Sequence, residues 1–193
     1  EKHPDFIRRF TAWRPDESLA NYPFVENRLS PFTPVRRALP LTNLGLVSSA
    51  GAYIDGTQPF DTDLKDGDAD FREIPRDVEV SDLCYAAKGY DPSSVKSDRN
   101  AQIPIDRLIE YEQNSVIGSL NECWWSLSSY IPNAAMVAGT IVPKLTERLK
   151  RYNVQAALLI PASRLCHQTL GIIARGLENN GIPTILISVD RSV

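Results

Sequence analysis

The clearest pattern of apolar positions lies near the end of the chain. Residues 156–160 and 184–189 form two largely continuous apolar runs, typical of strands buried on both faces of a sheet. Between them, apolar residues recur at helical spacing, at Leu165, Leu170, Ile173 and Leu177. Asn180-Gly181, followed by Pro183, then ends that helix. The pattern predicts a strand–helix–strand unit whose two strands are parallel.

Earlier segments predict further elements of the same kinds. Leu44–Ser49 is a short apolar run stopped by Ala50-Gly51, and alternation over residues 78–85 suggests a second strand. Pro104 fits the first turn of a helix over residues 105–111. A second amphipathic helix, ending near Tyr152-Asn153, follows from four-residue spacing of Val137, Ile141, Leu145 and Leu149.

The first 43 residues carry six prolines among scattered aromatic residues and hold no clear period. We therefore expect an irregular arm over residues 1–43 and an α/β domain over residues 44–193. Residues 51–75 look like a long loop with an acidic run from Asp61 to Asp70. The first residue is Glu1 rather than Met, which leaves open a trimmed version of a longer chain.

Alternating strands and helices with short connections predict an open, mainly parallel, doubly wound sheet of the flavodoxin or Rossmann type. In such sheets the ligand crevice lies beyond the carboxyl ends of the strands. Two segments of this sequence reach that position. They are the loop after Ser49 and the segment from Pro161 to Cys166.

Composition narrows the class of protein. Of the 193 residues, 42% are hydrophobic and 23% are charged, as in globular domains, and the net charge of −3 offers no basic footprint for nucleic acid or an anionic membrane. No apolar run is long enough to span a bilayer, so we expect a soluble protein. The three cysteines are widely spaced and form no CxxC pair, which favours a reducing, cytoplasmic setting and no metal site.

Cys166 is the first candidate for chemistry. It falls in the first turn of the predicted helix, where unpaired amides and the helix dipole favour a thiolate, and Arg164 and His167 could act in the same sense. The alternative is a small buried hydrophobe on the same face as Leu170 and Ile173. Spacing alone does not choose between a reactive and a structural cysteine.

Ser163 stands three residues before Cys166, at the position of a helix N-cap, so its hydroxyl is expected to accept the Cys166 amide hydrogen. As a nucleophile it would need a base, and His167 is the candidate within the segment. Capping is the stronger interpretation.

Other motifs point away from common functions. The acidic run places Lys65 at the third ligand position of a calcium loop and lacks its glycine, so a solvated loop is expected. No glycine-rich nucleotide motif follows a strand. Trp124 and Trp125, with Tyr130, suggest a core or interface cluster, and His3 is expected to be uninvolved.

Three blocks of sequence, in order, resemble one family. The first holds Leu46-Val-Ser-Ser-Ala-Gly-Ala-Tyr53, Gln58-Pro-Phe-Asp61 and Gly67-Asp-Ala-Asp-Phe-Arg-Glu-Ile-Pro75. The second holds Tyr90-Asp91, Asn100, Ile103-Pro-Ile-Asp-Arg-Leu108 and Ile117-Gly118-Ser119. The third holds Leu158-Leu-Ile-Pro161, Cys166-His-Gln-Thr-Leu-Gly-Ile-Ile-Ala-Arg175, Leu177-Glu178 and Gly181-Ile-Pro-Thr184. This order resembles the selenoprotein B family of glycine, sarcosine and betaine reductases, together with the matching D-proline reductase subunit.

The resemblance implies a reductase subunit that acts on a small amino-acid-like or amine substrate. In that family a selenocysteine, sometimes a cysteine, stands three residues before a cysteine at a helix start. The selenolate attacks the carbon beside the substrate nitrogen, which a partner subunit activates as a Schiff base on a pyruvoyl group, and the thiol helps resolve the product. The resemblance therefore implies no cofactor in this chain, a pyruvoyl group on a partner, and assembly with another subunit or with itself.

In this sequence Ser163 occupies the selenocysteine position and Cys166 that of the resolving thiol. A serine hydroxyl is a poorer nucleophile and undergoes no redox cycling. Two interpretations follow: a reductase subunit that uses Cys166, Ser163 and His167, or a binding and scaffolding subunit that has lost the selenol site. For the first, the residues expected to shape the substrate pocket are Ser48, Ser49, Gly51, Asp91, Asn100 and Arg164, with Asp106 nearby.

Overall fold

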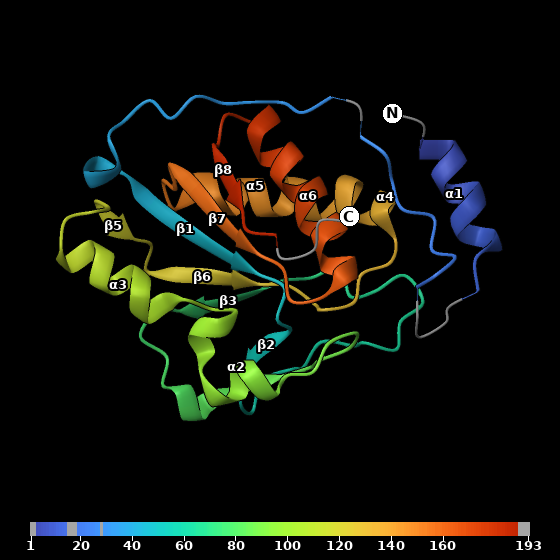
Figure 1. The fold of residues 1–193 in the computed structure, drawn as a ribbon, viewed down its shortest axis with the longest axis horizontal. Coiled ribbons are helices and arrows are strands. Elements are labelled where there is room, and N and C mark those ends of the chain that lie inside the picture. The colour runs from blue at the N-terminus through green and yellow to red at the C-terminus, as the bar shows by residue number, and fades with distance from the viewer. Residues whose placement is uncertain (1–2, 15–18, 28, 189–193) are drawn as a thin grey trace.

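A computed structural model describes residues 3–14, 19–27 and 29–188 (Figure 1). Its central sheet runs in the order β3-β6-β1-β7-β8, with β5 also paired to β1. Only β3 is antiparallel to its neighbour. The strands are β1 (Asn43–Ser48), β3 (Arg72–Pro75), β5 (Ser119–Leu120), β6 (Cys123–Ser126), β7 (Ala156–Ile160) and β8 (Thr184–Leu186). The protein is a mixed α/β fold built on a mostly parallel sheet, as the alternating elements predicted.

Helices cover both faces of this sheet (Figure 1). On one face, α5 (Val142–Arg151) and α6 (Arg164–Asn179) pack against Trp125 and Leu159, and on the other face α3 (Ile105–Gln113) packs against Trp124 and Leu46. The two tryptophans point to opposite faces because side chains alternate along β6. Both are core residues, which agrees with the core interpretation of this pair.

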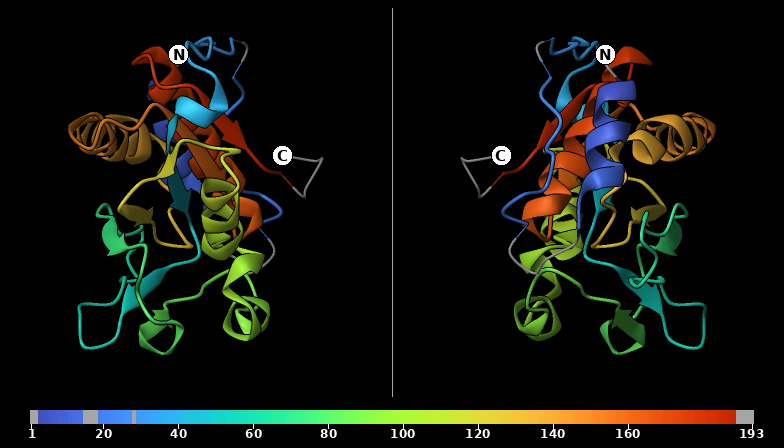
Figure 2. Two further views of the ribbon diagram at one scale, coloured as in Figure 1. Left: turned by 90° about the vertical axis from the view of Figure 1, so that its left-hand side faces the viewer. Right: turned by 90° about the vertical axis from the view of Figure 1, so that its right-hand side faces the viewer.

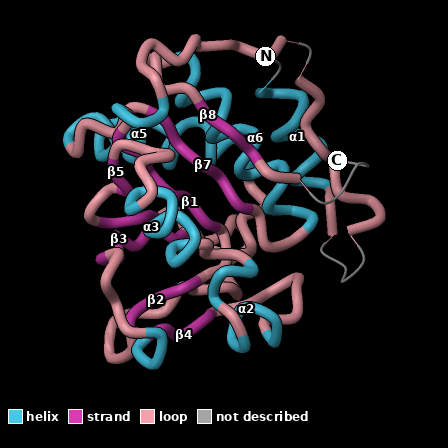
Figure 3. Tube along the Cα trace, turned by 60° about the vertical axis from the view of Figure 1, so that its left-hand side comes forward, coloured by secondary structure: helices cyan, strands magenta, loops and turns pink. Residues whose placement is uncertain are grey.

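A second, smaller group of elements follows β1. Strands β2 (Ala52–Ile54) and β4 (Leu83–Tyr85) form an antiparallel pair, and α2 (Ser93–Ser97) lies close to them, apart from the main sheet (Figure 3). Three short 3-10 turns complete the elements before α3, at η1 (Leu39–Leu41), η2 (Val80–Asp82) and η3 (Arg99–Ala101). The segment expected as one long loop therefore contains β2 and β3, and the strand expected over residues 78–85 is confined to its last three residues.

The helix predicted from Val137 to Leu149 is confirmed, with one irregularity. It begins as α4 (Ala134–Met136), continues as a π-helical segment, η4 (Val137–Ile141), and becomes α5. Pro143 lies in the first turn of α5. Proline has no amide hydrogen and its ring crowds the preceding turn, so the regular α-helical hydrogen bonds are interrupted here. The wider π-helical turn accommodates this interruption.

The expectation that residues 1–43 are irregular throughout is wrong for its start, where α1 (His3–Ala12) forms. Phe6, Phe10 and Trp13 recur at helical spacing and share one buried cluster with Leu165 of α6. Figure 2 shows α1 beside the α6 end of the molecule. The part of the arm around residues 30–38 lacks regular structure, as predicted, and Thr33 joins it to α6 through Glu178. The expectation for His3 concerns a side chain outside the described residues.

Among the described helices, none has both the length and the apolar content needed to cross a membrane.

Candidate active site at the strand ends

The carboxyl ends of β1, β6 and β7 meet at one edge of the sheet, because these strands are parallel neighbours. The Ser49 amide donates to the Ile160 carbonyl at 3.2 Å, and the Ala162 amide donates to the Ser49 hydroxyl at 3.1 Å. The Leu127 amide donates to the Ser48 carbonyl at 2.8 Å. Both segments expected to line the crevice, after Ser49 and after Pro161, are thus brought together.

Ser163 caps α6, as predicted. Its hydroxyl accepts the Cys166 amide hydrogen at 3.3 Å, and the extended backbone at Ser163 is that of an N-cap residue. The same oxygen lies 3.1 Å from the Cys166 sulfur and 3.3 Å from the Ser129 carbonyl. The hydroxyl at position 163 and the thiol at position 166 are therefore in direct contact in this chain.

Cys166 combines features of both interpretations given for it. Its side chain is only 1% exposed, as expected of a structural cysteine. However, it stands outside the core cluster that contains Leu170 and Ile173. Its sulfur contacts oxygen atoms, donating toward the carbonyls of Ser129 at 3.2 Å and Ser49 at 3.7 Å. The thiol is thus buried among polar groups at the strand ends.

His167 is buried against the same turn but does not reach the Ser163 hydroxyl. Its Nδ1 lies 2.8 Å from the Ser163 carbonyl oxygen, so this nitrogen carries the hydrogen of that bond. Nε2 is buried and, among the residues that the structure describes, has no hydrogen-bond partner. The arrangement orients the ring against the helix start and gives no nucleophile–base pair with the Ser163 hydroxyl. Arg164 is directed to the arm, with its guanidinium 5.5 Å from the centre of the Phe24 ring.

A cover segment, residues 86–90, crosses these strand ends. The Ala86 amide donates to the Gly51 carbonyl at 2.9 Å, and the Ser129 hydroxyl accepts the Lys88 amide at 2.8 Å. On the other side of the segment, the Tyr90 hydroxyl donates to the Ala50 carbonyl at 2.6 Å. Burial, and to a smaller extent the nearby Cys166, raises the pKa of Tyr90, so its phenol remains a neutral donor.

Of the remaining residues predicted to shape the substrate pocket, some lie at the strand ends and others are bonded within turns of their own. Ser48 lies at the strand ends, with its hydroxyl donating to the Gln102 carbonyl at 3.0 Å. Gly51 has a φ of +69°, and a Cβ there would stand 2.4 Å from the Ala86 carbonyl oxygen, so only glycine fits. Asp91 is exposed and accepts hydrogen bonds from the Ser93 amide and hydroxyl, which lower the pKa of its carboxyl.

Asn100 and Asp106 belong to a separate network at the start of α3. The Asn100 amide donates to the carboxylates of Asp98 and Asp106, and Arg99 donates two hydrogen bonds to Asp106. These bonds hold the pKa of Asp106 below its usual range. Asn100 therefore orders this turn, and its amide is already occupied.

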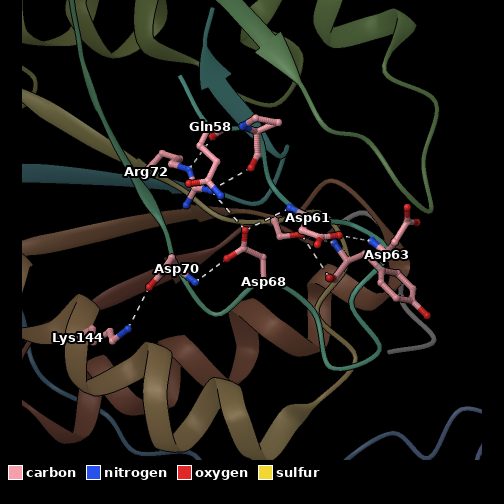
Figure 4. Close-up of polar contacts among 10 residues, drawn as sticks. Gln58, Asp61, Asp63, Asp68, Asp70, Arg72 and Lys144 are labelled. Atoms are coloured by element: carbon pink, nitrogen blue, oxygen red, sulfur yellow. Dashed lines mark hydrogen bonds and ion pairs between the residues drawn. The ribbon is translucent and has the colours of Figure 1, made fainter. Parts of the chain in front are cut away.

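The side chains of the acidic run contact protein groups (Figure 4). Asp61 and Asp68 accept backbone amides of Asp63 and Asp70, Arg72 pairs with Asp68 at 3.4 Å, and Lys144 pairs with Asp70 at 3.0 Å. Among the residues that the structure describes, no group of histidine, cysteine and acidic side chains is arranged to hold a metal ion.

Sequence reasoning missed two residues of the strand-end site, Ser129 and Tyr90. Leu127-Ser-Ser129 directly follows β6, which itself ends in Ser126, and such a serine-rich stretch is a usable signal once the strand is recognised. Nothing in the sequence around Tyr90 shows that it reaches back to Ala50.

The molecule described so far is an α/β protein with a buried thiol at the carboxyl ends of a mostly parallel sheet. Comparison with known proteins shows which family this chain resembles. Residues 72–162 match the family model of glycine/sarcosine/betaine reductase selenoprotein B. The resemblance drawn from the motifs is thus confirmed: over these residues the chain is similar to that family.

Three curated relatives carry consistent names. D-proline reductase subunit gamma of Acetoanaerobium sticklandii is 30% identical over 157 residues, which is 81% of this chain and 64% of that protein. Glycine reductase complex component B subunit gamma of Symbiobacterium thermophilum is 29% identical over 50% of this chain and 22% of its own length. Betaine reductase complex component B subunit beta of Peptoclostridium acidaminophilum is 27% identical over 50% of this chain and 22% of its own length.

The chain therefore spans less than two thirds of the curated relatives that it matches. The family match ends at residue 162, directly before Ser163 and Cys166. No solved structure matches the chain.

Proposed function

We propose that this chain is a subunit of a reductase complex of the glycine, sarcosine, betaine and D-proline reductase type, and that its chemistry takes place at the carboxyl ends of β1, β6 and β7. The observation that carries this proposal is the contact between Ser163 and Cys166, with 3.1 Å between oxygen and sulfur at the first turn of α6. The named relatives, all subunits of such reductases, support the same assignment.

In this proposal Cys166 is the nucleophile or redox thiol for a small amino-acid-like or amine substrate. Attack of its thiolate on the carbon beside the nitrogen forms a carbon–sulfur bond, breaks the carbon–nitrogen bond and leaves the electron pair on nitrogen, which takes up a proton. A second thiol must then attack the Cys166 sulfur: a sulfur–sulfur bond forms, the carbon–sulfur bond breaks with its electron pair on carbon, which takes up a proton, and the two thiols end oxidised as a disulfide. Ser163 cannot take the place of this second thiol, because a hydroxyl has no accessible redox couple.

Partners and fold complete the proposal. The chain binds another reductase subunit, or a second copy of itself, and a pyruvoyl group that activates the substrate belongs to a partner and not to this chain. The sheet is proposed to be of the doubly wound, flavodoxin or Rossmann type. Helices on both faces and the central place of β1 between β6 and β7 support this finer assignment.

A scaffolding subunit that has lost the selenol site is the second candidate function. Two observations favour it: Cys166 is 1% exposed with its thiol donating to backbone carbonyls, and serine replaces the selenol. For this candidate the strand ends would retain the family geometry without its chemistry.

Iodoacetamide labelling of native protein across a pH series, with peptide mass spectrometry, separates the two candidates. Trypsin cleaves after Arg164 and Arg175, so the Cys166 label is carried by a peptide of its own. For the reductase subunit we expect Cys166 to be labelled readily in the native protein. Cys123, buried in the same sample, is the internal control and should label only on unfolding. If Cys166 also labels only in denaturant, the scaffolding function is correct.

A further inference from the structure

The cover segment comes close to Ser163 at Gly89. A Cβ placed on Gly89 would lie 3.8 Å from Ser163 Cβ and 3.9 Å from its Oγ. Apart from the flanking residues, no other heavy atom of the described part of the chain lies within 4 Å of that point. Gly89 is exposed, whereas Ser163 is 7% exposed. A side chain at position 89 would therefore fill a space that lies between the buried Ser163 and the solvent.

Residues on both sides of Gly89 hold it in this place. The Lys88 amide is bonded to Ser129 after β6, its ammonium donates to the Thr62 carbonyl at 2.6 Å, and Tyr90 is bonded to Ala50 after β1. Gly89 itself has a φ of +80°, a conformation that glycine adopts without strain. The cover segment is thus fixed to the ends of β6 and β1, and between these two attachments it crosses the end of β7. At this crossing, Gly89 places no side chain over Ser163.

We propose that Gly89 sets the size of ligand that reaches the side chain at position 163. This inference rests on the proposed function, in which that side chain lies in the substrate site. A reacting carbon must come within ~3–3.5 Å of an attacking atom. A methyl group at position 89, 3.9 Å from Ser163 Oγ, would occupy much of that approach volume. The site therefore admits small, slender amines and amino acids, and excludes ligands with bulk next to the reacting carbon.

Labelling of a thiol introduced by Ser163→Cys tests this proposal without any need for catalysis. The variant is labelled, reduced and under anaerobic conditions, with iodoacetamide or with the bulkier N-phenylmaleimide. Trypsin cleavage after Arg164 separates the label at position 163 from that at Cys166. We expect iodoacetamide to react readily and Gly89→Ala, added to this variant, to lower its rate by at least ~10-fold, with a larger loss for the bulky reagent.

Gly56→Ala is the matched control. Gly56 has a φ of +76°, close to that of Gly89, but no heavy atom lies within 4 Å of its Cβ position. It therefore carries the same backbone strain without filling the space beside Ser163, and labelling at position 163 should not change. If Gly89→Ala and Gly56→Ala label at the same rate with both reagents, or if Gly89→Ala labels faster, the proposal is wrong.

Tyr90→Phe provides a second test should Gly89→Ala fail to fold. Loss of the bond to Ala50 loosens one end of the cover, so the bulky reagent should react faster at position 163 while iodoacetamide changes little. Unchanged rates for both reagents, in a folded Tyr90→Phe variant, would overturn the proposal. The result is also independent of the proposed reaction, since size-dependent access at position 163 does not require a reactive Cys166.

Discussion

Two buried cysteines stand at opposite ends of the same sheet, and their surroundings differ more than their burial. Cys123 opens β6, is 8% exposed and belongs to the core cluster with Trp125 and Leu149. Cys166 follows β7, is 1% exposed and belongs to no such cluster. The Cys123 sulfur accepts from the Asn121 amide at 3.6 Å. The Cys166 sulfur instead lies among oxygen atoms, accepting from the Ser163 hydroxyl at 3.1 Å and donating to the Ser129 carbonyl at 3.2 Å. Exposure alone would have ranked Cys166 as the more inert of the two.

The difference follows from the polarity of parallel strands. At the carboxyl ends, strand carbonyls and a helix N-terminus meet around one side chain, and this combination is what ligand sites in such sheets use. At the start of β6, burial is the main influence and raises the pKa of Cys123. A thiol in this fold is therefore better judged by the end of the sheet at which it lies than by its exposed fraction.

The largest expected effect is an all-or-none one. In Ser163→Cys the new sulfur would replace an oxygen that lies 3.1 Å from the Cys166 sulfur, so mild oxidation should join the two in a disulfide. Two thiols give up two electrons and two protons to oxidised glutathione, and Cys123 stays free. Thiol counting and peptide mapping check the result. Thr169→Cys, also three residues from Cys166 but inside α6, is the control and should form no bond.

A smaller effect is expected from removal of the cap itself. Ser163→Ala leaves the Cys166 amide without its acceptor and should lower the free energy of unfolding by about 1 kcal/mol, while Ser163→Gly should cost only a few tenths. Urea unfolding measures both variants. Equal losses for alanine and glycine would show that the hydroxyl does not act as a cap, and the comparison with Cys123 would then rest on the carbonyl contacts alone.

The smallest effect concerns Asp106, which accepts hydrogen bonds from Asn100 and Arg99 at the start of α3. Because hydrogen bonds from Arg99 lower its pKa in the folded state, the carboxylate stabilises the fold above its unfolded pKa of ~3.9, and this contribution is lost as pH falls through the folded value. Asp106→Asn should cost at most ~1 kcal/mol near neutral pH, since the carboxylate is 41% exposed.

The difference between Asp106→Asn and the unchanged protein should disappear in urea titrations at pH values below the folded pKa. Glu147→Gln, in an exposed pair, is the control and should have little effect at either pH. A loss that persists in acid would mean that Asn100 is held by packing and not by the Arg99–Asp106 pair.

The sequence was informative where one local pattern is sufficient. The two apolar runs around α6 predicted β7 and β8, and Ser163 three residues before Cys166 predicted a cap. It failed where contacts depend on strand order. Ser129 and Tyr90 reach the site only because β6 and β7 flank β1, and β6 is a four-residue strand whose role is visible only in the sheet. The period in α1 is short and bounded by prolines, which hid its aromatic face.

The aromatic cluster of the arm has a practical consequence for any shortened form of this protein. Tyr22 accepts a hydrogen bond from Gln168, and Gln168 in turn accepts the Val25 amide, so the arm is tied to the second turn of the helix that carries Cys166. A fragment that starts at the sheet would uncover Leu165 and leave Gln168 without these partners. Its thiol reactivity would then describe a destabilised helix start, and measurements on such a fragment would overstate how accessible Cys166 is in the complete chain.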